Sequence, residues 1–459
     1  MTNDQPHTES VADTAQQKYA DTTVEEGGAV PENAATDNTT AGENSIGAKV
    51  HRHLSLRPMV ARDPHEDGRV ATTLELFFDL VFVVASGNSA EHFHHQLAEG
   101  NTTSSVYKFL MVSFAIWWTW VNFSFFAASF DTDDWLYRVL TLIQMAGMLV
   151  ANAGIPRIYD ERPDVEHAVN VHSPFFVLAL GYVIMRAALV IQWIRATMCR
   201  GNASRAAWVY IAGLIAIQAC WMGLPFYPNY VQAPLFPVFV AVELIIPAIA
   251  EQVGRTPWHP HHVTERFNLF TIIQLGECIS GAANAISGAV EDAEHRPRLI
   301  GLYVCAFIVN SGLWWIYFWA PHHEHISSYW RAFSYAYLHF FIFTAAGAFS
   351  TGVDSMVSEI QGKSHLRNWQ TSLALTVPVA VFILGTLFTV MLRYTDPIAR
   401  GVMVAGALIM QLDALIPEAM ILTTVCIVVI VGVLVWRKSI HERSHLGRES
   451  FAEVDDVSI

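Results

Sequence analysis

Apolar stretches of roughly 20 residues recur along most of this chain, and a helix needs about that length to cross a bilayer. Of the 459 residues, 53% are apolar and only 15% are charged, whereas soluble domains carry about 25% charged residues. Lipid is therefore the expected solvent for most of the chain. The predicted fold class is all-α, a polytopic transmembrane helix bundle of about 12 spans, with about 10 as the lower bound.

The positions of the spans follow from the apolar runs. The eleventh run is the shortest, which makes it the least secure span. The predicted helices run near residues 72–90, 106–127, 135–155, 174–195, 206–224, 233–251, 265–288, 298–320, 332–353, 369–393, 399–413 and 418–437.

The two ends of the chain differ from the apolar part. Residues 1–50 contain nine acidic residues against Lys18 and Lys49, and almost no large apolar residues. Such a segment buries too little surface to offset the entropy of ordering, so residues 1–68 are predicted to be a disordered tail. No apolar run follows a basic start, so no signal peptide is expected there. Residues 438–459 form the predicted C-terminal tail.

The distribution of Lys and Arg predicts the orientation, because loops on the cytoplasmic side are enriched in these residues. With the N-terminus inside, the inner loops receive most of the Arg residues and the outer loops receive few. Both tails are therefore expected to be cytoplasmic, in a multi-pass protein of the plasma membrane. The inner set is Arg52, Arg57, Arg62, Arg69, Arg195, Arg200, Arg205, Arg255, Arg393, Arg400, Arg437 and Lys438, and the outer set is Arg157, Arg162, Arg296, Lys363 and Arg367.

A weak internal repeat divides the apolar part into halves at 69–260 and 261–437. The first half opens with ELFFDLVFVVASGN from Glu75, and the second with ERFNLFTIIQLGEC from Glu265. The next helix of each half carries a tryptophan pair, in AIWWTWVNF and in GLWWIYFW. Six spans in each half predict two parallel repeats related by an axis along the membrane normal. Chance likeness between aromatic-rich helices is the alternative.

Ionisable side chains within apolar runs are costly in hydrocarbon and are therefore functional candidates. Glu243 and Glu277 lie at the middle of the sixth and seventh predicted spans. Asp79 follows Glu75 by four residues, which places both carboxylates on one helix face. Together with Glu265, these acids are the candidates for a pathway of protons or small monovalent cations. The alternative is that they join helices, as paired or hydrogen-bonded groups.

For two further ionisable side chains within the spans, a structural role is the favoured interpretation. Arg186 lies just past the middle of the fourth span and is expected to pair with Glu243 or Asp79, although a place in the pathway stays open. His339 lies within the ninth span, where it could titrate near neutral pH. A hydrogen-bonded core histidine is the favoured interpretation.

Two backbone patterns surround the deep glutamates. Gly276, Ser280 and Asn284 follow each other at four-residue spacing, which favours close helix approach and would also admit water to Glu277. The sixth span contains Pro234, Pro237 and Pro247, so a bent or interrupted helix is expected around Glu243.

Metal and cofactor sites are not expected. Histidines cluster at three span ends, but none of the clusters has the ligand spacing of a zinc site. The five cysteines are scattered singly, and no phosphate-binding loop, nucleotide fingerprint or hydrolase motif occurs. Nucleic acid is likewise not an expected partner, and self-association stays open. The clusters are His92, His94 and His95; His259, His261 and His262; and His322, His323 and His325.

The ELFFDLVFVVA stretch at 75–85, followed by ERFNLFTIIQLGECI at 265–279, resembles the bacterial low-temperature-requirement A (LtrA) family over roughly residues 65–437. Gln274 and Cys278 depart from the residues usual in that family. The resemblance implies a polytopic membrane protein whose molecular activity is poorly defined. A weaker likeness connects Phe77-Phe78-Asp79, Trp120 and Asn122 with the first two helices of six-span cation channels.

The leading hypothesis is a channel or proton-coupled permease for a small ion or solute. The rival is a non-conducting scaffold or sensor in the envelope or cold stress response. An enzyme is not expected, although Glu91 with His92, His94 and His95 would be the cluster available to one that acts on lipid.

Overall fold

The computed structural model describes one region of the chain, from the end of the predicted tail into the last helix. Residues 1–56 of the predicted tail at 1–68, and residues 457–459 of the predicted C-terminal tail, lie outside the described residues. The described region is 57–456, apart from 64–65, 67–69, 131, 160–173, 200–201, 228, 292–293, 323–325, 327, 392–394 and 417–419.

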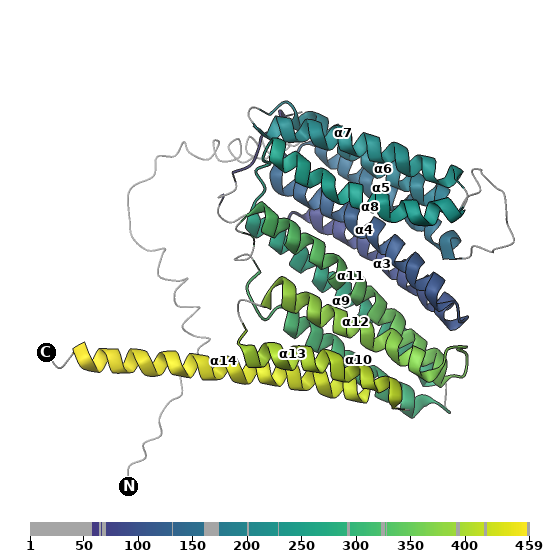
Figure 1. Ribbon diagram of the computed structural model, residues 1–459, viewed down its shortest axis with the longest axis vertical. Helices are drawn as coiled ribbons and strands as arrows, with labels where there is room; N and C mark the ends of the chain where they lie inside the picture. The colour runs from purple at the N-terminus through teal and green to yellow at the C-terminus, as the bar shows by residue number, and fades with distance from the viewer. Residues whose placement is uncertain are drawn as a thin grey trace, which may run out of the picture. The chain divides into compact units, whose positions relative to one another are not determined.

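Twelve long helices and two short 3-10 helices make up this region, and the described residues contain no strand (Figure 1). The all-α prediction is confirmed. The long helices are α3 (Thr73–Ala98), α4 (Thr102–Phe130), α5 (Trp135–Tyr159), α6 (Pro174–Ala196), α7 (Asn202–Gly223), α8 (Asn229–Val253), α9 (Pro260–Glu291), α10 (Arg296–Tyr317), α11 (Tyr329–Ile360), α12 (Asn368–Thr389), α13 (Pro397–Ile409) and α14 (Ile421–Asp456); the 3-10 helices are η1 (Leu224–Phe226) and η4 (Met410–Leu415).

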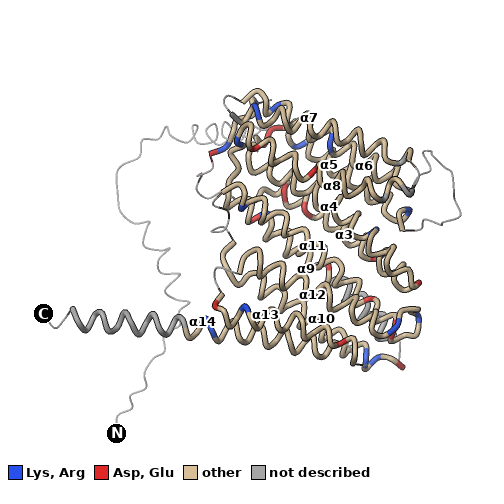
Figure 2. The backbone as a smooth tube through the Cα atoms, viewed as in Figure 1, with Lys and Arg blue, Asp and Glu red and all other residues tan. Residues whose placement is uncertain are grey.

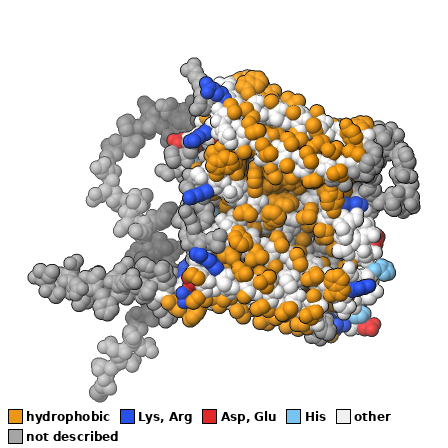
Figure 3. Space-filling model, in the orientation of Figure 1, with side chains coloured by type: hydrophobic (Ala, Val, Ile, Leu, Met, Phe, Trp, Pro, Cys, Tyr) orange, Lys and Arg blue, Asp and Glu red, His pale blue; other side chains and the backbone are white. Residues whose placement is uncertain are grey.

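Eleven of these helices are long and apolar enough to cross a membrane. The predicted eleventh span is among them, because η4 continues α13 and extends the apolar segment over Pro397–Leu415. Helix α9, the predicted seventh span, carries the polar residues Asn268, Gln274 and Glu277 in the part whose side chains the structure describes. Hydrophobic side chains cover the visible face between the helix ends (Figure 3). The polarity of α9 therefore requires partners inside the bundle.

Successive helices run back and forth with short connections, so α3, α9 and α11 share one direction (Figure 1). We call the end of the bundle where α3 begins the proximal end, and the other the distal end. Charged residues gather at these two ends (Figure 2). Because the number of long helices is even, α14 also leaves the bundle at the proximal end.

The two halves pack their helices in the same order. In each half the first helix contacts the second and the third, and the third contacts the fourth. The fourth helix in turn contacts the fifth, and the fifth contacts the sixth. This shared order is compatible with a parallel repeat of six plus six helices, which stays a prediction.

The second helices of the halves differ in their surroundings. Helix α4 also contacts α9 and α11 of the other half, whereas α10 packs against α14. Trp117 and Trp118 are consequently buried, while Trp314 and Trp315 are 46% and 43% exposed. The tryptophan pairs that suggested the repeat therefore do not occupy equivalent environments.

The start of the described chain packs on the bundle, although its sequence placed it in the tail. Met59 is buried, and the backbone N–H of Arg57 donates to Asp134 between α4 and α5. Arg195 at the end of α6 donates to the same carboxylate. Burial raises the pKa of Asp134, but hydrogen bonds from Arg195 and two backbone amides outweigh it and hold that pKa below its usual value.

Glycines allow the closest helix contact in each half. A Cβ added at Gly181 of α6 would lie 2.3 Å from the backbone nitrogen of Ala151 in α5 and 2.5 Å from the carbonyl oxygen of Gly147. A Cβ at Gly352 of α11 would lie 2.6 Å from the Cα of Leu375 in α12. The neighbours are backbone atoms, so only glycine allows these helices to approach this closely.

Replacing Gly181 with alanine should separate α5 from α6, because backbone atoms cannot rotate away from the added methyl group. Overpacking of this kind costs about 1–3 kcal/mol. We expect a lower melting temperature of the detergent-purified protein. Gly301→Ala in α10 is the matched control, since nothing lies within 4 Å of its added Cβ. Equal melting temperatures for the two variants would contradict the close α5–α6 contact.

Candidate ion pathway

Helices α3, α9 and α11 meet along a central seam, with α4 covering one side of it. Because the three helices run in one direction, residues can be placed along the seam from the proximal to the distal end. The seam carries a charged inner cluster, an aromatic layer and a polar outer part, in that order.

The inner cluster is built around Arg266 of α9, which is fully buried. Its guanidinium contacts Asp79 of α3 and lies 3.2 Å from the Oε1 of Glu75. Trp120 of α4 donates its indole N–H to Asp79 at 2.7 Å. His262 lies 3.1 Å from Glu75. Two acids from the first helix of one half thus pair with two basic groups from the first helix of the other half.

Local sequence explains the position of Glu75. Thr72 is the N-cap of α3, and its hydroxyl accepts a hydrogen bond from the N–H of Glu75 at 3.2 Å. The Glu75 carboxylate returns the interaction by accepting the N–H of Thr72 at 2.7 Å. This reciprocal capping box orients the carboxylate at the helix start. The same carboxylate therefore fixes the helix end and faces Arg266.

Sequence reasoning did not single out Arg266 as a deep charge. The predicted seventh span began at 265, so Arg266 looked like a residue at a helix boundary. The structure starts α9 five residues earlier, at Pro260, which places Arg266 in its second turn. Asp79 could have indicated that Arg266 is buried, because a carboxylate in hydrocarbon needs a cationic partner.

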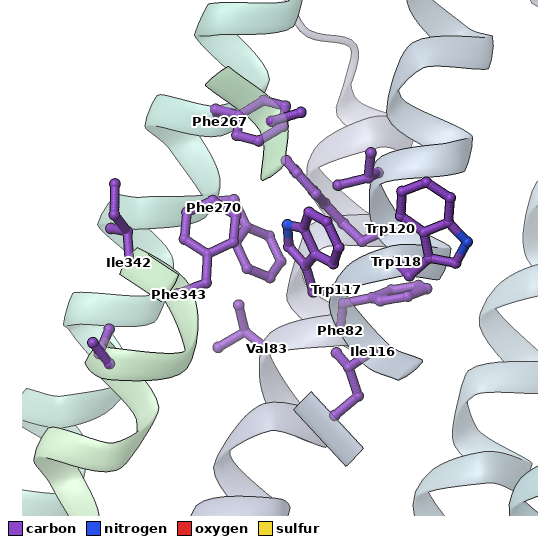
Figure 4. Close-up of a cluster of buried hydrophobic side chains, with 14 of the residues drawn as sticks. Phe82, Val83, Ile116, Trp117, Trp118, Trp120, Phe267, Phe270, Ile342 and Phe343 are labelled. Atoms are coloured by element: carbon purple, nitrogen blue, oxygen red, sulfur yellow. The ribbon is translucent and has the colours of Figure 1, made fainter. Parts of the chain in front are cut away.

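An aromatic layer follows the inner cluster toward the distal end (Figure 4). The ring of Phe270 lies 4.5 Å from the ring of Trp120 and 4.7 Å from that of Phe343 in α11, measured between centroids. Val83 of α3 is buried beside them. These side chains come from all four helices of the seam and fill it with apolar surface.

Beyond the aromatic layer the seam becomes polar again. Gln274 donates to the hydroxyl of Ser86 at 2.6 Å. Glu277 lies opposite Gly87, where an added Cβ would be only 2.9 Å from its Oε1. Although Glu277 is in the middle of α9, its side chain is exposed in the structure. Gly87 is eight residues beyond Asp79, so roughly 12 Å of helix separates Glu277 from the inner cluster.

The distal end of the seam carries further ionisable groups. Asp354 of α11 lies close enough to Glu91 and His95 of α3 to interact electrostatically with both. The His95 ring is 4.0 Å from the Glu91 carboxylate. His94 is within 3.3 Å of the hydroxyl of Ser355. Part of the cluster assigned above to a lipid-acting enzyme therefore lies at the outer end of the seam.

Glu243 of α8 lies outside the seam and has partners. Its carboxylate is 2.8 Å from Arg186 of α6, and both side chains are buried. Trp118 and Trp221 also donate their indole N–H groups to it. Of the two acids that were expected as partners of Arg186, the structure pairs it with Glu243, so Glu243 is not a free carboxylate. The helix is also continuous from Asn229 to Val253 despite its three prolines, which corrects the expected interruption.

Glu265 and His339 complete the predicted set. Glu265 is partly exposed and accepts the N–H of Ala71 at 3.0 Å, which ties α9 to the start of α3. His339 is fully buried, with Nδ1 2.7 Å from the carbonyl of Tyr335 and Nε2 2.9 Å from the hydroxyl of Tyr317. This is the arrangement of a hydrogen-bonded core histidine, with the Tyr317 hydroxyl donating to Nε2.

The described residues contain no group of three or more His, Cys, Asp or Glu side chains placed to hold a metal ion. His323 and His325 of the third histidine cluster lie outside the described residues, as do the side chains of Ser280 and Asn284. All five cysteines are free thiols.

The apolar helices and the buried, paired charges define a multi-pass helical membrane protein. The family model for the bacterial low temperature requirement A protein (LtrA) matches residues 70–435, and the chain belongs to this family. An uncharacterized protein of Rhizobium meliloti (strain 1021) is 24% identical over 266 residues, which are 56% of this chain and 60% of that protein. The chain thus spans about 60% of the length of that relative. No solved structure matches the chain.

Removing Arg266 should destabilise the protein, because it leaves Asp79 and Glu75 buried without their main partner. Breaking a buried pair in this way costs about 3–5 kcal/mol. We expect Arg266→Gln to reduce the yield of folded protein strongly, as measured by fluorescence-detected size-exclusion chromatography. The double variant with Asp79→Asn should recover part of the yield, since it removes the uncompensated charge. A double variant no better folded than Arg266→Gln would refute this pairing.

Proposed function

We propose that the protein is a channel or proton-coupled permease for a small cation, which moves along the central seam. The observation that carries the proposal is the exposed carboxylate of Glu277 in the middle of α9, on the distal side of the aromatic layer. An acid at this depth has a high cost in hydrocarbon unless it meets water or an ion.

The distal half of the seam attracts cations. Glu277, Glu91 and Asp354 are acidic, and His95 is the titratable base beside them. Acidic side chains that line an entrance raise the local concentration of cations. A single carboxylate at the deepest point suits a proton or a monovalent cation, which must bind weakly enough to leave again.

The aromatic layer is the proposed gate. Phe270, Phe343 and Trp120 close the seam with apolar surface, and hydrophobic constrictions block ions because water withdraws from them. Conduction then requires rotation of these rings or a shift of α9 against α11. On the proximal side, the positive charge of the buried Arg266 guanidinium would oppose the passage of a cation, and its pairing with Asp79 neutralises that charge.

We further propose that the proximal end faces the cytoplasm, at the plasma membrane. Among the described residues, the proximal helix ends carry more Lys and Arg than the distal ends, which favours this orientation. The proximal set is Arg57, Arg62, Arg138, Arg195, Arg205, Arg255, Arg331, Arg400, Arg437 and Lys438, and the distal set is Lys108, Arg157, Arg296, Arg298, Lys363 and Arg367.

A non-conducting scaffold or sensor is the second candidate. The pairing of Glu243 with Arg186 favours it, because a carboxylate held by an arginine and two indoles is a structural group and is not available to an ion. This candidate treats Glu277 in the same way, as an acid that affects folding without affecting flux.

The two candidates differ in proteoliposome flux of protons and monovalent cations. We expect wild-type flux above that of empty liposomes, and a reduction of about tenfold for Glu277→Gln, because neutralising the deepest acid removes its attraction for the cation. Glu99→Gln is the matched control, since Glu99 is an exposed acid beyond the end of α3. Wild-type flux equal to the empty-liposome background would exclude conduction under these conditions and favour the scaffold.

The gate gives a separate prediction with the opposite sign. Phe270→Ala removes the ring that contacts both Trp120 and Phe343, so it should raise resting flux several-fold above wild type. Phe388→Ala is the control, because Phe388 is 56% exposed on α12, away from the seam. The same proteoliposome flux assay measures both variants. Unchanged resting flux in well-folded Phe270→Ala protein would show that this layer is not the barrier.

A further inference from the structure

A second site lies outside the seam, in a pocket between the two halves near the proximal end. Helices α4, α6, α7 and α8 of the first half line it on one side, and α11 of the second half on the other. Eight of its lining residues are aromatic: Trp118, Phe125, Trp193, Tyr210, Trp258, Tyr329, Phe333 and Tyr337.

The rings form a continuous wall. Phe333 lies 5.8 Å from Tyr337, which lies 5.9 Å from Trp118, as measured between ring centroids. Phe125 contacts both Trp258 and Phe333 at 6.4 Å. The faces of aromatic rings attract organic cations through cation–π interactions, whereas their edges do not.

One acid lines the pocket. Glu251 of α8 is 4% exposed and accepts hydrogen bonds from the N–H and hydroxyl of Thr256 and from the hydroxyl of Tyr210. These donors are neutral, so they do not cancel the charge of the ionised carboxylate, and Arg255 lies close enough to interact with it electrostatically. Among the described residues that line the pocket, none is Lys, Arg or His.

Pro247 leaves one backbone carbonyl of α8 without its helical hydrogen bond. Pro247 lines the pocket and is four residues beyond Glu243. Because proline has no N–H, it cannot donate the helical hydrogen bond to the carbonyl of Glu243. Trp118, which also lines the pocket, donates its N–H to the carboxylate of the same residue.

The pocket opens toward the proximal surface. A neighbouring open depression shares Glu251 and Tyr329 with it and is also lined by the exposed Arg255. The enclosed volume of the pocket is about 30 Å³, which is room for about two water-sized groups. A trimethylammonium group is larger than this, so its binding would require the partly exposed rings of Tyr329 and Phe333 to move. The occupant is therefore small and reaches the pocket from the proximal side.

We propose that this pocket binds a small organic ammonium group, such as a methylated amine or the trimethylammonium head of choline. The aromatic rings recognise the diffuse positive charge, and Glu251 supplies the counter-charge. A compact, strongly hydrated ion such as Na⁺ is disfavoured, because most of the lining is aromatic and ring surface cannot replace its hydration shell.

The test is isothermal titration calorimetry of the full-length, detergent-purified protein with tetramethylammonium chloride, with NaCl titrated as the ionic control. We expect saturable binding of tetramethylammonium and none of Na⁺. Glu251→Gln and Trp258→Leu should each raise the Kd about tenfold, through loss of the counter-charge and of a ring face. Glu359→Gln and Trp314→Leu are matched controls outside the pocket and should bind as wild type does.

Glu251 also holds Thr256 and Tyr210 in place, so Glu251→Gln could disturb the fold. Its Kd is therefore used only if the variant elutes like wild type in size-exclusion chromatography. If it does not, Trp258→Leu alone tests the pocket. The absence of saturable wild-type binding would overturn the proposal, as would a Kd unchanged in the folded pocket variants. Nanodiscs separate the two sources of the ligand. If phosphatidylcholine competes with tetramethylammonium and phosphatidylglycerol does not, the site binds a lipid headgroup. If neither lipid competes, the site binds a dissolved amine.

Discussion

The fold depends on the way that one buried guanidinium holds the two halves together. Arg266 begins the second half and pairs with Glu75 and Asp79 at the start of the first half, while Trp120 completes the set. In a low-dielectric interior an unpaired charge is very costly, so these groups must remain in contact. The contact fixes the first helices of the halves beside each other and sets the register of the central seam.

The consequences of this register extend along the seam. Helices α3 and α9 run parallel and are joined at the proximal end. Phe270 therefore packs against Trp120 of α4 and Phe343 of α11, and Glu277 lies next to Gly87. An apolar layer thereby separates an ion-paired half from an acidic half. The arrangement is asymmetric between the repeats, because α4 enters the centre while α10 lies at the edge.

Sequence alone predicted the parts of this structure that depend on local composition. The spans were visible because lipid requires a long apolar run wherever a helix crosses it. Long-range pairing was less accessible: Arg266 and Asp79 lie 187 positions apart, and Arg186 had more than one acid to choose from. Burial was not predictable either. Trp314 resembles Trp117 in sequence, but it lies on α10 at the edge of the bundle, whereas Trp117 lies on α4 between the two halves. Glu277 was found because it is a charge in an apolar run.

The central claim is that water and ions reach the distal side of the aromatic layer but not the layer itself. Cysteine accessibility tests it directly, in a background in which the five native cysteines are replaced. A membrane-impermeant methanethiosulfonate reagent added on the distal side should label Glu277→Cys rapidly and leave Val83→Cys unmodified. Equal labelling of both positions would contradict the apolar layer, and an unreactive Glu277→Cys would contradict the water-filled outer half.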